Sequence, residues 1–577
     1  MIPAVLAPAA GAAGAAGAAA TTFKTPYFDY HALAPEMVLT AVALIVLVLD
    51  LVVDEDHKHL VSQVAGIGIL ATFVPIITLG VSGLTNHART MFGGAYVVDV
   101  FSLVMKALFL GVGYVILLMS STYIEEGDYY EGEFAFLILC SLIGMVVMSS
   151  SRDLISIFIA LELLSIPTYL LAGFRKRDLR SNEGSIKYYL LGVLATGVML
   201  YGMSLIFGAT GSTVLSTIGT RLSVNHNLQP LITIGIFFVV IGFAFKISAV
   251  PFHFWAPDTY EGAPTPVTAF LSVASKTGGF VALFELIYVG FFSRADVWQP
   301  LFWILAALTM TVGNLIALRQ TNIVRMLAYS SIAQAGYILV PFAVAGNIHG
   351  KNAQDPITAS IVYLLLYAAM NLGAFAVVIT VARRTRSGEI SSYGGLINYA
   401  PGVTVMMTVF LFSLAGIPPL GGWFAKYYVF RAVADANTPA AWILGVLVAV
   451  NSVIALVYYA NVGSLMWTAP VPAELVPVPV GVGAVAVGAT GGGAVARGSA
   501  GSGSAGSESA RSAGSGSAGS ESGSAGSGSG AKAAVPERIR VPASLATAIG
   551  ICAAVVVVLG IYPQAFARLG DLARLTH

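Results

Sequence analysis

The sequence predicts an all-α membrane protein with about 14 transmembrane helices, including two inverted five-helix repeats that each contain a broken helix. Its composition is the first reason. Of 577 residues, 57% are hydrophobic and 10% are charged, whereas a soluble domain has roughly 25% charged residues. The second reason is the presence of apolar stretches long enough to cross a bilayer. The third is that two motifs of the first half recur in the second half.

The predicted spans are apolar stretches of about 20 residues between turn signals. Residues 1–34 precede them as an Ala/Gly-rich tail. This tail lacks the basic start and apolar core of a cleaved signal, so we expect a disordered external segment. The spans cover approximately 35–53, 61–80, 98–121, 134–149, 152–173, 183–208, 231–252, 264–291, 298–317, 321–344, 357–381, 402–433, 440–467 and 542–566.

An N-terminal three-helix segment (35–121) comes before two five-helix units, 134–291 and 298–467. The motif FKISAVP, ending at Pro251, recurs as FSLAGIP, ending at Pro418, and SIKYYLL recurs as SIVYLLL. Because each unit has an odd number of spans, the second unit is expected to lie upside down relative to the first. Each unit also has one proline-interrupted helix, and such breaks at matching places indicate an ion site.

Residues 470–541 are rich in Gly, Ser and Ala, and this composition predicts a disordered cytoplasmic linker. The span 542–566 that follows is a C-terminal transmembrane helix. Basic residues in short loops number ten on one side and five on the other if the N-terminus is outside. This bias favours a multi-pass protein with both termini external.

Five of the ten lysines lie inside apolar segments, whereas no arginine lies in the middle of one. Charged groups in a membrane interior are rare and usually mark an ion or proton path. A lysine can lose its proton when desolvated, whereas an arginine stays charged. The sequence therefore predicts a protein that handles protons. The five lysines in apolar segments are Lys106, Lys187, Lys246, Lys276 and Lys426.

For each candidate, a role in proton transfer competes with a purely structural or surface-reaching role. Glu162, Lys246 and Lys276 lie deep in their spans, which favours a functional role. Lys187 lies near the end of its span, where it either transfers protons or extends to the surface. Lys426, eight residues after Pro418, is a candidate exit group.

Other polar residues have simpler interpretations. Lys106, two turns after Asp99, is more consistent with a structural pairing or a surface-reaching side chain than with transport. Glu285 is equally consistent with either role. His253, next to the first break, is either a proton relay or a packed histidine.

The motifs FKISAVPFHFWAPDTYEGAPTPVTAFLSVASK, ALELLSIPTYLLAGF, SIKYYLLG and AGIPPLGGWFAKYYVF together resemble the antiporter-like subunit N of NADH-quinone oxidoreductase, complex I. The resemblance covers about residues 35–467 and the last helix. It implies a working pair of Glu162 and Lys246, and a polar axis continued by Lys187, Lys276 and Lys426. It also implies a subunit of a proton-translocating enzyme in the bacterial inner membrane, beside another antiporter-like subunit and other membrane subunits. The Gly/Ser-rich insertion departs from the common subunit N pattern.

Two alternatives share this fold: a subunit of an Mrp-type cation/proton antiporter and a subunit of a membrane-bound hydrogenase. We expect no cofactor or metal in the chain itself. The two cysteines are isolated, and no phosphate-binding loop, flavin fingerprint or metal-ligand cluster is present in the sequence. The balanced charge also gives no reason to expect nucleic acid as a partner. Redox chemistry that drives such a subunit would take place elsewhere.

Overall fold

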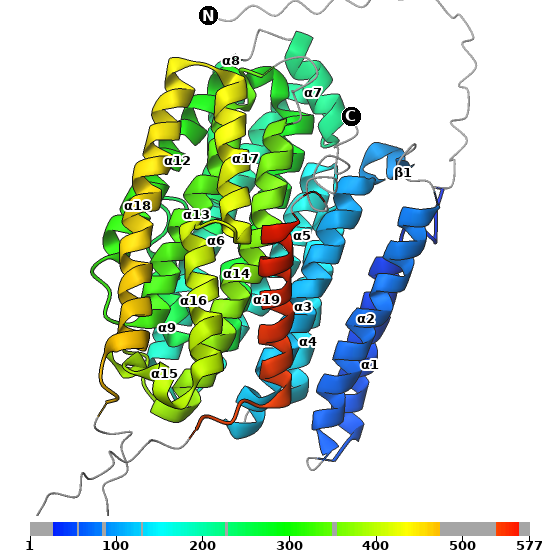
Figure 1. Ribbon diagram of the computed structural model, residues 1–577. Coiled ribbons are helices and arrows are strands. Elements are labelled where there is room, and N and C mark those ends of the chain that lie inside the picture. Colours follow the sequence, from blue (N-terminus) through cyan, green and yellow to red (C-terminus); the bar gives the residue numbers. More distant parts are fainter. Residues whose placement is uncertain are drawn as a thin grey trace, which may run out of the picture.

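The computed structural model describes residues 27–54, 57–82, 88–127, 131–224, 229–348, 355–472, 538–562 and 564. They form one bundle of long helices (Figure 1). Thirteen helices in the described part are long and apolar enough to cross a membrane. The remaining predicted span, 402–433, is divided into two shorter helices, so the all-α membrane fold is confirmed. Most of the predicted tail and linker, residues 1–26 and 473–537, lies outside the described residues.

The N-terminal segment consists of three helices and a small hairpin. Its helices are α1 (Ala34–Val52), α2 (His59–Val81) and α3 (Val100–Glu126). Between α2 and α3, β1 (Arg89–Met91) pairs antiparallel with β2 (Tyr96–Val98) around η2 (Phe92–Gly94), a hairpin that the sequence did not predict. Asp99 starts α3 through a capping box with Ser102, which satisfies two backbone groups at the helix start.

The first five-helix unit includes one additional short helix, α7, that was not predicted. The span after its broken helix is continuous but alternates between α-helical and π-helical turns. Its elements are α4 (Glu131–Met148), α5 (Leu154–Ala172), α6 (Leu179–Thr210), α7 (Leu215–Val224), α8 (Gln229–Lys246), α9 (Trp255–Gly262), α10 (Thr265–Phe270), η3 (Leu271–Ser275), α11 (Lys276–Phe284) and η4 (Glu285–Gly290).

The second unit follows the same order of long helices and is followed by the final helix. Its elements are η5 (Phe292–Arg294), α12 (Ala295–Ala317), α13 (Ile323–Ala345), α14 (Asp355–Thr385), η7 (Ile390–Tyr393), α15 (Leu396–Tyr399), α16 (Pro401–Ala415), α17 (Gly421–Ala436) and α18 (Pro439–Thr468). The final helix is α19 (Ala543–Ile561). The inverted relation between the two units stays a prediction, as do the boundaries assigned to them.

Both predicted helix breaks are present. The first separates α8 from α9, with Ser248 at φ 58°, and the second separates α16 from α17, with Gly416 at φ 90°. Protein groups satisfy backbone atoms that these breaks release: Val250 N donates to Thr309 Oγ1 (2.9 Å) and Gly422 N donates to Ser413 Oγ (3.0 Å). Inside a membrane, non-helical backbone is tolerated only where such partners satisfy its N–H and C=O groups.

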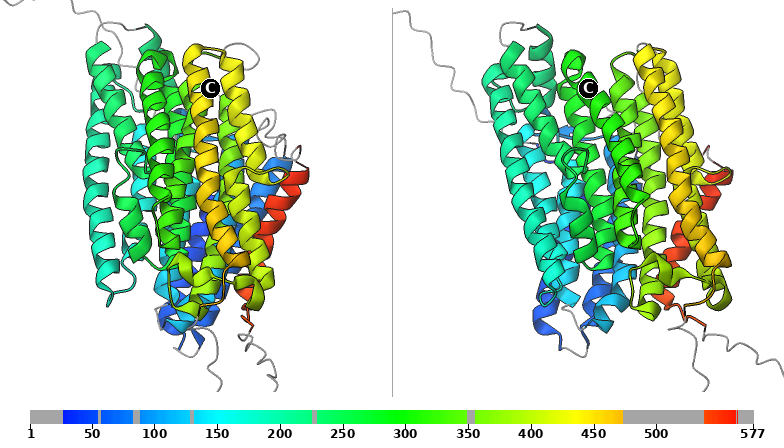
Figure 2. Two further views of the ribbon diagram at one scale, coloured as in Figure 1. Left: turned by 60° about the vertical axis from the view of Figure 1, so that its left-hand side comes forward. Right: turned by 90° about the vertical axis from the view of Figure 1, so that its left-hand side faces the viewer.

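Three spans form the centre of the bundle. The most apolar windows of 265–290 and α14 are wholly buried, and that of α13 is 94% buried, whereas the windows of α6 and α18 are 33% buried. Figures 1 and 2 show α6 and α18 on the outside of the bundle, with α7 and β1 at one end and α15 at the other. We call these the α7 end and the α15 end. Polar groups on the central spans are therefore shielded from lipid.

Candidate functional site

Lys246 ends α8 at the first break and is 3% exposed. Its Nζ donates to Ser165 Oγ of α5 (2.8 Å) and to the Tyr188 hydroxyl of α6 (3.2 Å). The ammonium also lies 5.7 Å from the centre of the Tyr188 ring, within the range of a cation–π contact. Two helices of the first unit, α5 and α6, thus hold Lys246 through neutral groups.

Glu162 lies one helical turn before Ser165 on α5, so both side chains are on the same face of that helix. It is half-buried, and its Oε1 has no hydrogen-bond partner in the described structure. No ion pair within 4.0 Å joins Glu162 to Lys246 across the described residues. The predicted pair therefore shares a neighbour, Ser165, without direct contact, and its functional role stays a prediction.

Lys276 begins α11, directly after the π-helical turn η3, and is 2% exposed. Its Nζ donates to Ser331 Oγ of α13 (2.7 Å) and lies 5.8 Å from the centre of the Tyr260 ring of α9. The groups around the Lys276 amine thus come from α9, which follows the first break, and from α13 of the second unit. Neither contact was predictable from sequence spacing.

Aromatic rings connect the Lys246 position with the Lys276 position. Tyr188 stacks on Trp255 with centroids 4.3 Å apart, and Trp255 meets Tyr260 at 6.0 Å. The helix of Lys276 also packs against the Lys246 side chain. A Cβ at Gly279, one turn after Lys276, would lie 3.3 Å from the Lys246 Cγ. Both lysines therefore belong to one buried region.

Polar groups continue from Lys276 into the second unit. Gln334, one turn after Ser331 on α13, donates to the Leu414 carbonyl (3.1 Å) and accepts from the Tyr363 hydroxyl (2.5 Å). Leu414 is the penultimate residue of α16, next to the second break. Ser331 contacts Lys276 and Gln334 contacts the end of α16, so α13 places polar groups between Lys276 and the second break.

Lys426 occupies that second break. Its Nζ donates to the Ala415 carbonyl (2.7 Å), which ends α16, and lies 4.8 Å from the centre of the Tyr337 ring. Gly416 makes room for the side chain, because a Cβ there would lie 2.8 Å from Lys426 Cδ. Lys426 is 4% exposed, so all three deep lysines are buried.

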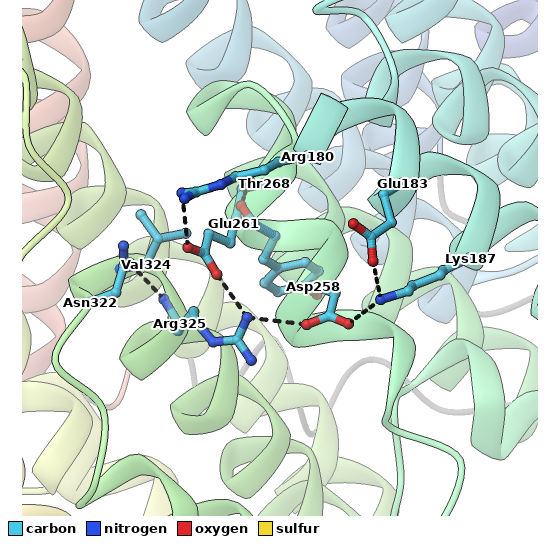
Figure 3. Close-up of polar contacts among 10 residues, drawn as sticks. Arg180, Glu183, Lys187, Asp258, Glu261, Thr268, Asn322, Val324 and Arg325 are labelled. Carbon is cyan, nitrogen blue, oxygen red and sulfur yellow. Dashed lines mark hydrogen bonds and ion pairs between the residues drawn. The ribbon is translucent and has the colours of Figure 1, made fainter. Parts of the chain in front are cut away.

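Lys187 differs from these lysines, because it is ion-paired and 43% of its side chain is exposed. It pairs with Glu183 (2.7 Å) and with Asp258 of α9 (2.8 Å). Figure 3 shows that Asp258 lies between Lys187 and Arg325. Of the two interpretations left open by the sequence, this geometry favours a surface-reaching charge.

Arg325 of α13 bridges two acids of α9, Asp258 (3.1 Å) and Glu261 (2.7 Å), and Glu261 also pairs with Arg180 (3.7 Å) (Figure 3). We call this group the α9 charge cluster. The sequence interpretation missed it, although two acids in the short DTYEG segment after the first break were a signal. The cluster ties α9 to α6 and α13. Tyr260, whose ring contacts Lys276, lies between Asp258 and Glu261 in the sequence. The cluster therefore holds Tyr260 in place beside Lys276.

His253 lies inside the first break and is 4% exposed. Its ring is 4.5 Å from that of Phe254, and its Nδ1 has no hydrogen-bond partner in the described part of the chain. Neither a proton relay nor a packed histidine is singled out by these contacts.

Lys106 forms a structural pairing, one of its two expected roles, but its partner is not the nearby Asp99. Asp99, the acid two turns earlier, instead binds Arg152 (2.8 Å), and Lys106 pairs with Glu36 of α1 (2.6 Å). Lys106 is fully buried, so it does not reach the surface. Arg152 also contacts Glu285. This arginine, between α4 and α5, is therefore buried between two acids.

The chain is also similar to known membrane proteins. A family model described as NADH:quinone oxidoreductase/Mrp antiporter, TM, matches residues 151–453. The chain is 40% identical to NADH-quinone oxidoreductase subunit N of Trichlorobacter lovleyi, over 78% of this chain and 90% of that protein. It is 42% identical to subunit N 2 of Streptomyces griseus, over 77% of this chain and 83% of that protein.

Solved structures give the same fold. A chain of respiratory complex I from Thermus thermophilus superposes with a TM-score of 0.66 and 25% identity, covering 92% of this chain and 98% of that one. A chain of the Mrp complex from a Dietzia species has a TM-score of 0.73 and 20% identity, covering 95% and 97%. The second likeness concerns the fold alone.

Proposed function

Because this chain belongs to the subunit N family of NADH-quinone oxidoreductase, we propose that it carries protons across the membrane through its buried lysines while quinone is reduced in other subunits. The family consists of antiporter-like membrane subunits. We assign no redox site to the chain. Its partners in this proposal are further membrane subunits of a complex I, including an adjacent antiporter-like subunit, in a bacterial inner membrane.

One observation carries the assignment of the lysines. Lys246, Lys276 and Lys426 are buried, and each donates to a hydroxyl or a carbonyl group rather than to a carboxylate. A buried ion pair that loses one charge leaves the other uncompensated, at a cost of about 3–5 kcal/mol. An amine held by neutral groups leaves no such charge behind. These three lysines are therefore suited to giving up and regaining a proton.

The paired lysines have a different role. Lys187 and Lys106 lie against carboxylates, so loss of either amine's charge would leave an acid without its partner. We assign Lys187 to the α9 charge cluster, where it anchors the broken helix near the α15 end. Glu162 lies one turn before Ser165, which Lys246 contacts, and in this proposal the Glu162 charge acts on Lys246.

In the proposed sequence of events, the Glu162 charge stabilises protonated Lys246. Withdrawal of that charge releases the proton toward Lys276. It then passes along Ser331 and Gln334 to Lys426. A change of one pKa unit corresponds to about 1.4 kcal/mol. Steps of this size are reversible, as a pump requires.

Arginine substitutions test the proposal. Lys276→Arg and Lys426→Arg keep the charge but cannot release it near neutral pH, so each is expected to abolish pumping nearly as completely as alanine. Lys187→Arg is the matched control, because an ion-paired anchor needs only its charge. Proton uptake by vesicles containing the whole complex is compared at equal assembly. Pumping at the parental rate by either deep arginine variant would contradict the relay at that lysine.

The identity of the partners is tested separately. A tagged chain should co-purify with quinone-binding and flavin-containing subunits if it belongs to a complex I. Recovery of small antiporter subunits alone would instead support the Mrp-type alternative.

A further inference from the structure

An open groove lies between α16 and α19 at the α15 end of the bundle. The two helices lie side by side (Figure 1), and the groove between them has a volume of about 420 Å³. Its walls include Val403 and Met406 of α16 and Ile549 of α19. Gly550 of α19 also lines the groove, and a Cβ added there would meet no atom within 4 Å. The groove therefore combines apolar walls with open space beside the bundle.

The segment before α19 brings a positive charge to this groove. Arg538 is exposed and lines the groove, whereas Ile539 and Val541 are partly buried and pack against the core. The Ile539 N–H donates to the Tyr399 carbonyl (3.3 Å), which holds the segment against α15. From the first residue of α19 to Gly550 is about 10 Å at 1.5 Å per residue. Arg538 therefore lies at the helix-start end of the groove, and the apolar walls continue from there along α19.

The charge of Arg538 is not neutralised by an acid in the described part of the chain. Arg538 forms no ion pair there, and no acidic side chain lines the groove. Arg384, in the last turn of α14, is also exposed and has no ion pair among the described residues. Its charge acts on Tyr399, which lines the groove. This end of the groove is therefore positive.

Tyr399 adds a hydrogen-bond donor at the same place. Its side chain is 1% exposed, and its hydroxyl has no hydrogen-bond partner among the residues described. Most buried polar side-chain atoms in proteins have such a partner. The Tyr399 hydroxyl is therefore available to donate to an anionic oxygen that binds beside Arg538.

These features fit a ligand with a negative head and an apolar tail. Basic pockets between transmembrane helices bind the headgroups of anionic lipids. A transmembrane helix of a partner would cover the apolar walls, but it gives no reason for an unpaired arginine at one end. We propose that the groove binds an anionic phospholipid, with an acyl chain between α16 and α19 and the phosphate at Arg538 and Tyr399. None of the three deep lysines lines the groove, so lipid binding can be measured whether or not the proposed lysine route is correct.

Photolabelling of the whole complex with a phosphatidylglycerol that carries a diazirine in one acyl chain tests the site. Mass spectrometry of the peptides should place the label on α16 and α19, and unlabelled phosphatidylglycerol should displace it better than phosphatidylcholine of the same chain length. Arg538→Gln should weaken binding about fivefold, the effect of one basic residue on an anionic lipid. Gly550→Leu should abolish the label on α16, because the added side chain fills the open space while Arg538 stays in place.

Matched controls change the same residue types elsewhere. Arg319→Gln alters an exposed arginine between α12 and α13, and Gly197→Leu alters an exposed glycine of α6 where a Cβ also meets nothing within 4 Å; both should keep the label. If Arg538→Gln does not assemble, Gly550→Leu decides the result. Unchanged labelling in either groove variant would overturn the proposal. Equal displacement by phosphatidylcholine, displacement by inorganic phosphate, or no label on α16 and α19 would do the same, by indicating a non-selective lipid contact, an ion site or a groove covered by a partner subunit.

Discussion

Replacement of Gly416 by alanine tests how closely Lys426 depends on the second helix break. Gly416 has φ 90°, where an L-residue costs roughly 1–2 kcal/mol. The added Cβ would lie 2.8 Å from Lys426 Cδ and 3.3 Å from Lys426 Nζ. Displacing that buried side chain from its rotamer adds about 0.5–1.5 kcal/mol. The clash should therefore disfavour the observed position of Lys426 by roughly 2- to 12-fold relative to displaced positions, while the backbone strain adds to the cost of folding.

Gly402→Ala is the matched control. Gly402 lies near the start of α16, and nothing is within 4 Å of the position its Cβ would take. Alanine there should be neutral or stabilise the helix, by up to about 1 kcal/mol. The two variants therefore add one methyl group at opposite ends of α16, but only the one at residue 416 meets Lys426.

The assay compares proton pumping and NADH oxidation in vesicles containing equal amounts of assembled complex. We expect Gly416→Ala to reduce pumping on the order of tenfold and Gly402→Ala to leave it unchanged. If the two variants pump equally well and are equally stable, then the break is not what positions Lys426.

Three further predictions follow from the same contacts. Glu162→Gln and Lys246→Ala should each reduce pumping and NADH oxidation together while the complex still assembles; normal proton-to-electron stoichiometry in both variants would remove these residues from the path. Arg325→Gln should weaken the α9 charge cluster by about 1 kcal/mol, since its pairs are partly exposed, and should slow pumping, with Arg325→Lys restoring part of the rate. Deletion of about residues 490–530, a segment predicted to be flexible from its composition, should preserve activity, and loss of assembly would instead show that the segment binds a partner.

Features encoded locally were predictable from the sequence. Long apolar stretches identified the spans, because the bilayer thickness sets the length of a transmembrane helix. Pro251 and Pro418 identified the two breaks, because proline lacks an N–H group and clashes with the preceding turn. The lysines were recognisable as unusual because charge is costly in an apolar segment. None of these inferences needed a contact between distant residues.

Distant contacts decided the rest. Ser165 is 81 residues from Lys246, and Ser331 is 55 residues from Lys276, so no local pattern pairs them. The sequence also did not distinguish lysines held by neutral groups from Lys187, which pairs with an acid 71 residues away. Lys106 shows the same limit, since its partner is on α1 rather than at the nearer Asp99. Helix packing alone determines which side chains meet, and the chemistry of a buried amine depends on the neighbour that it meets.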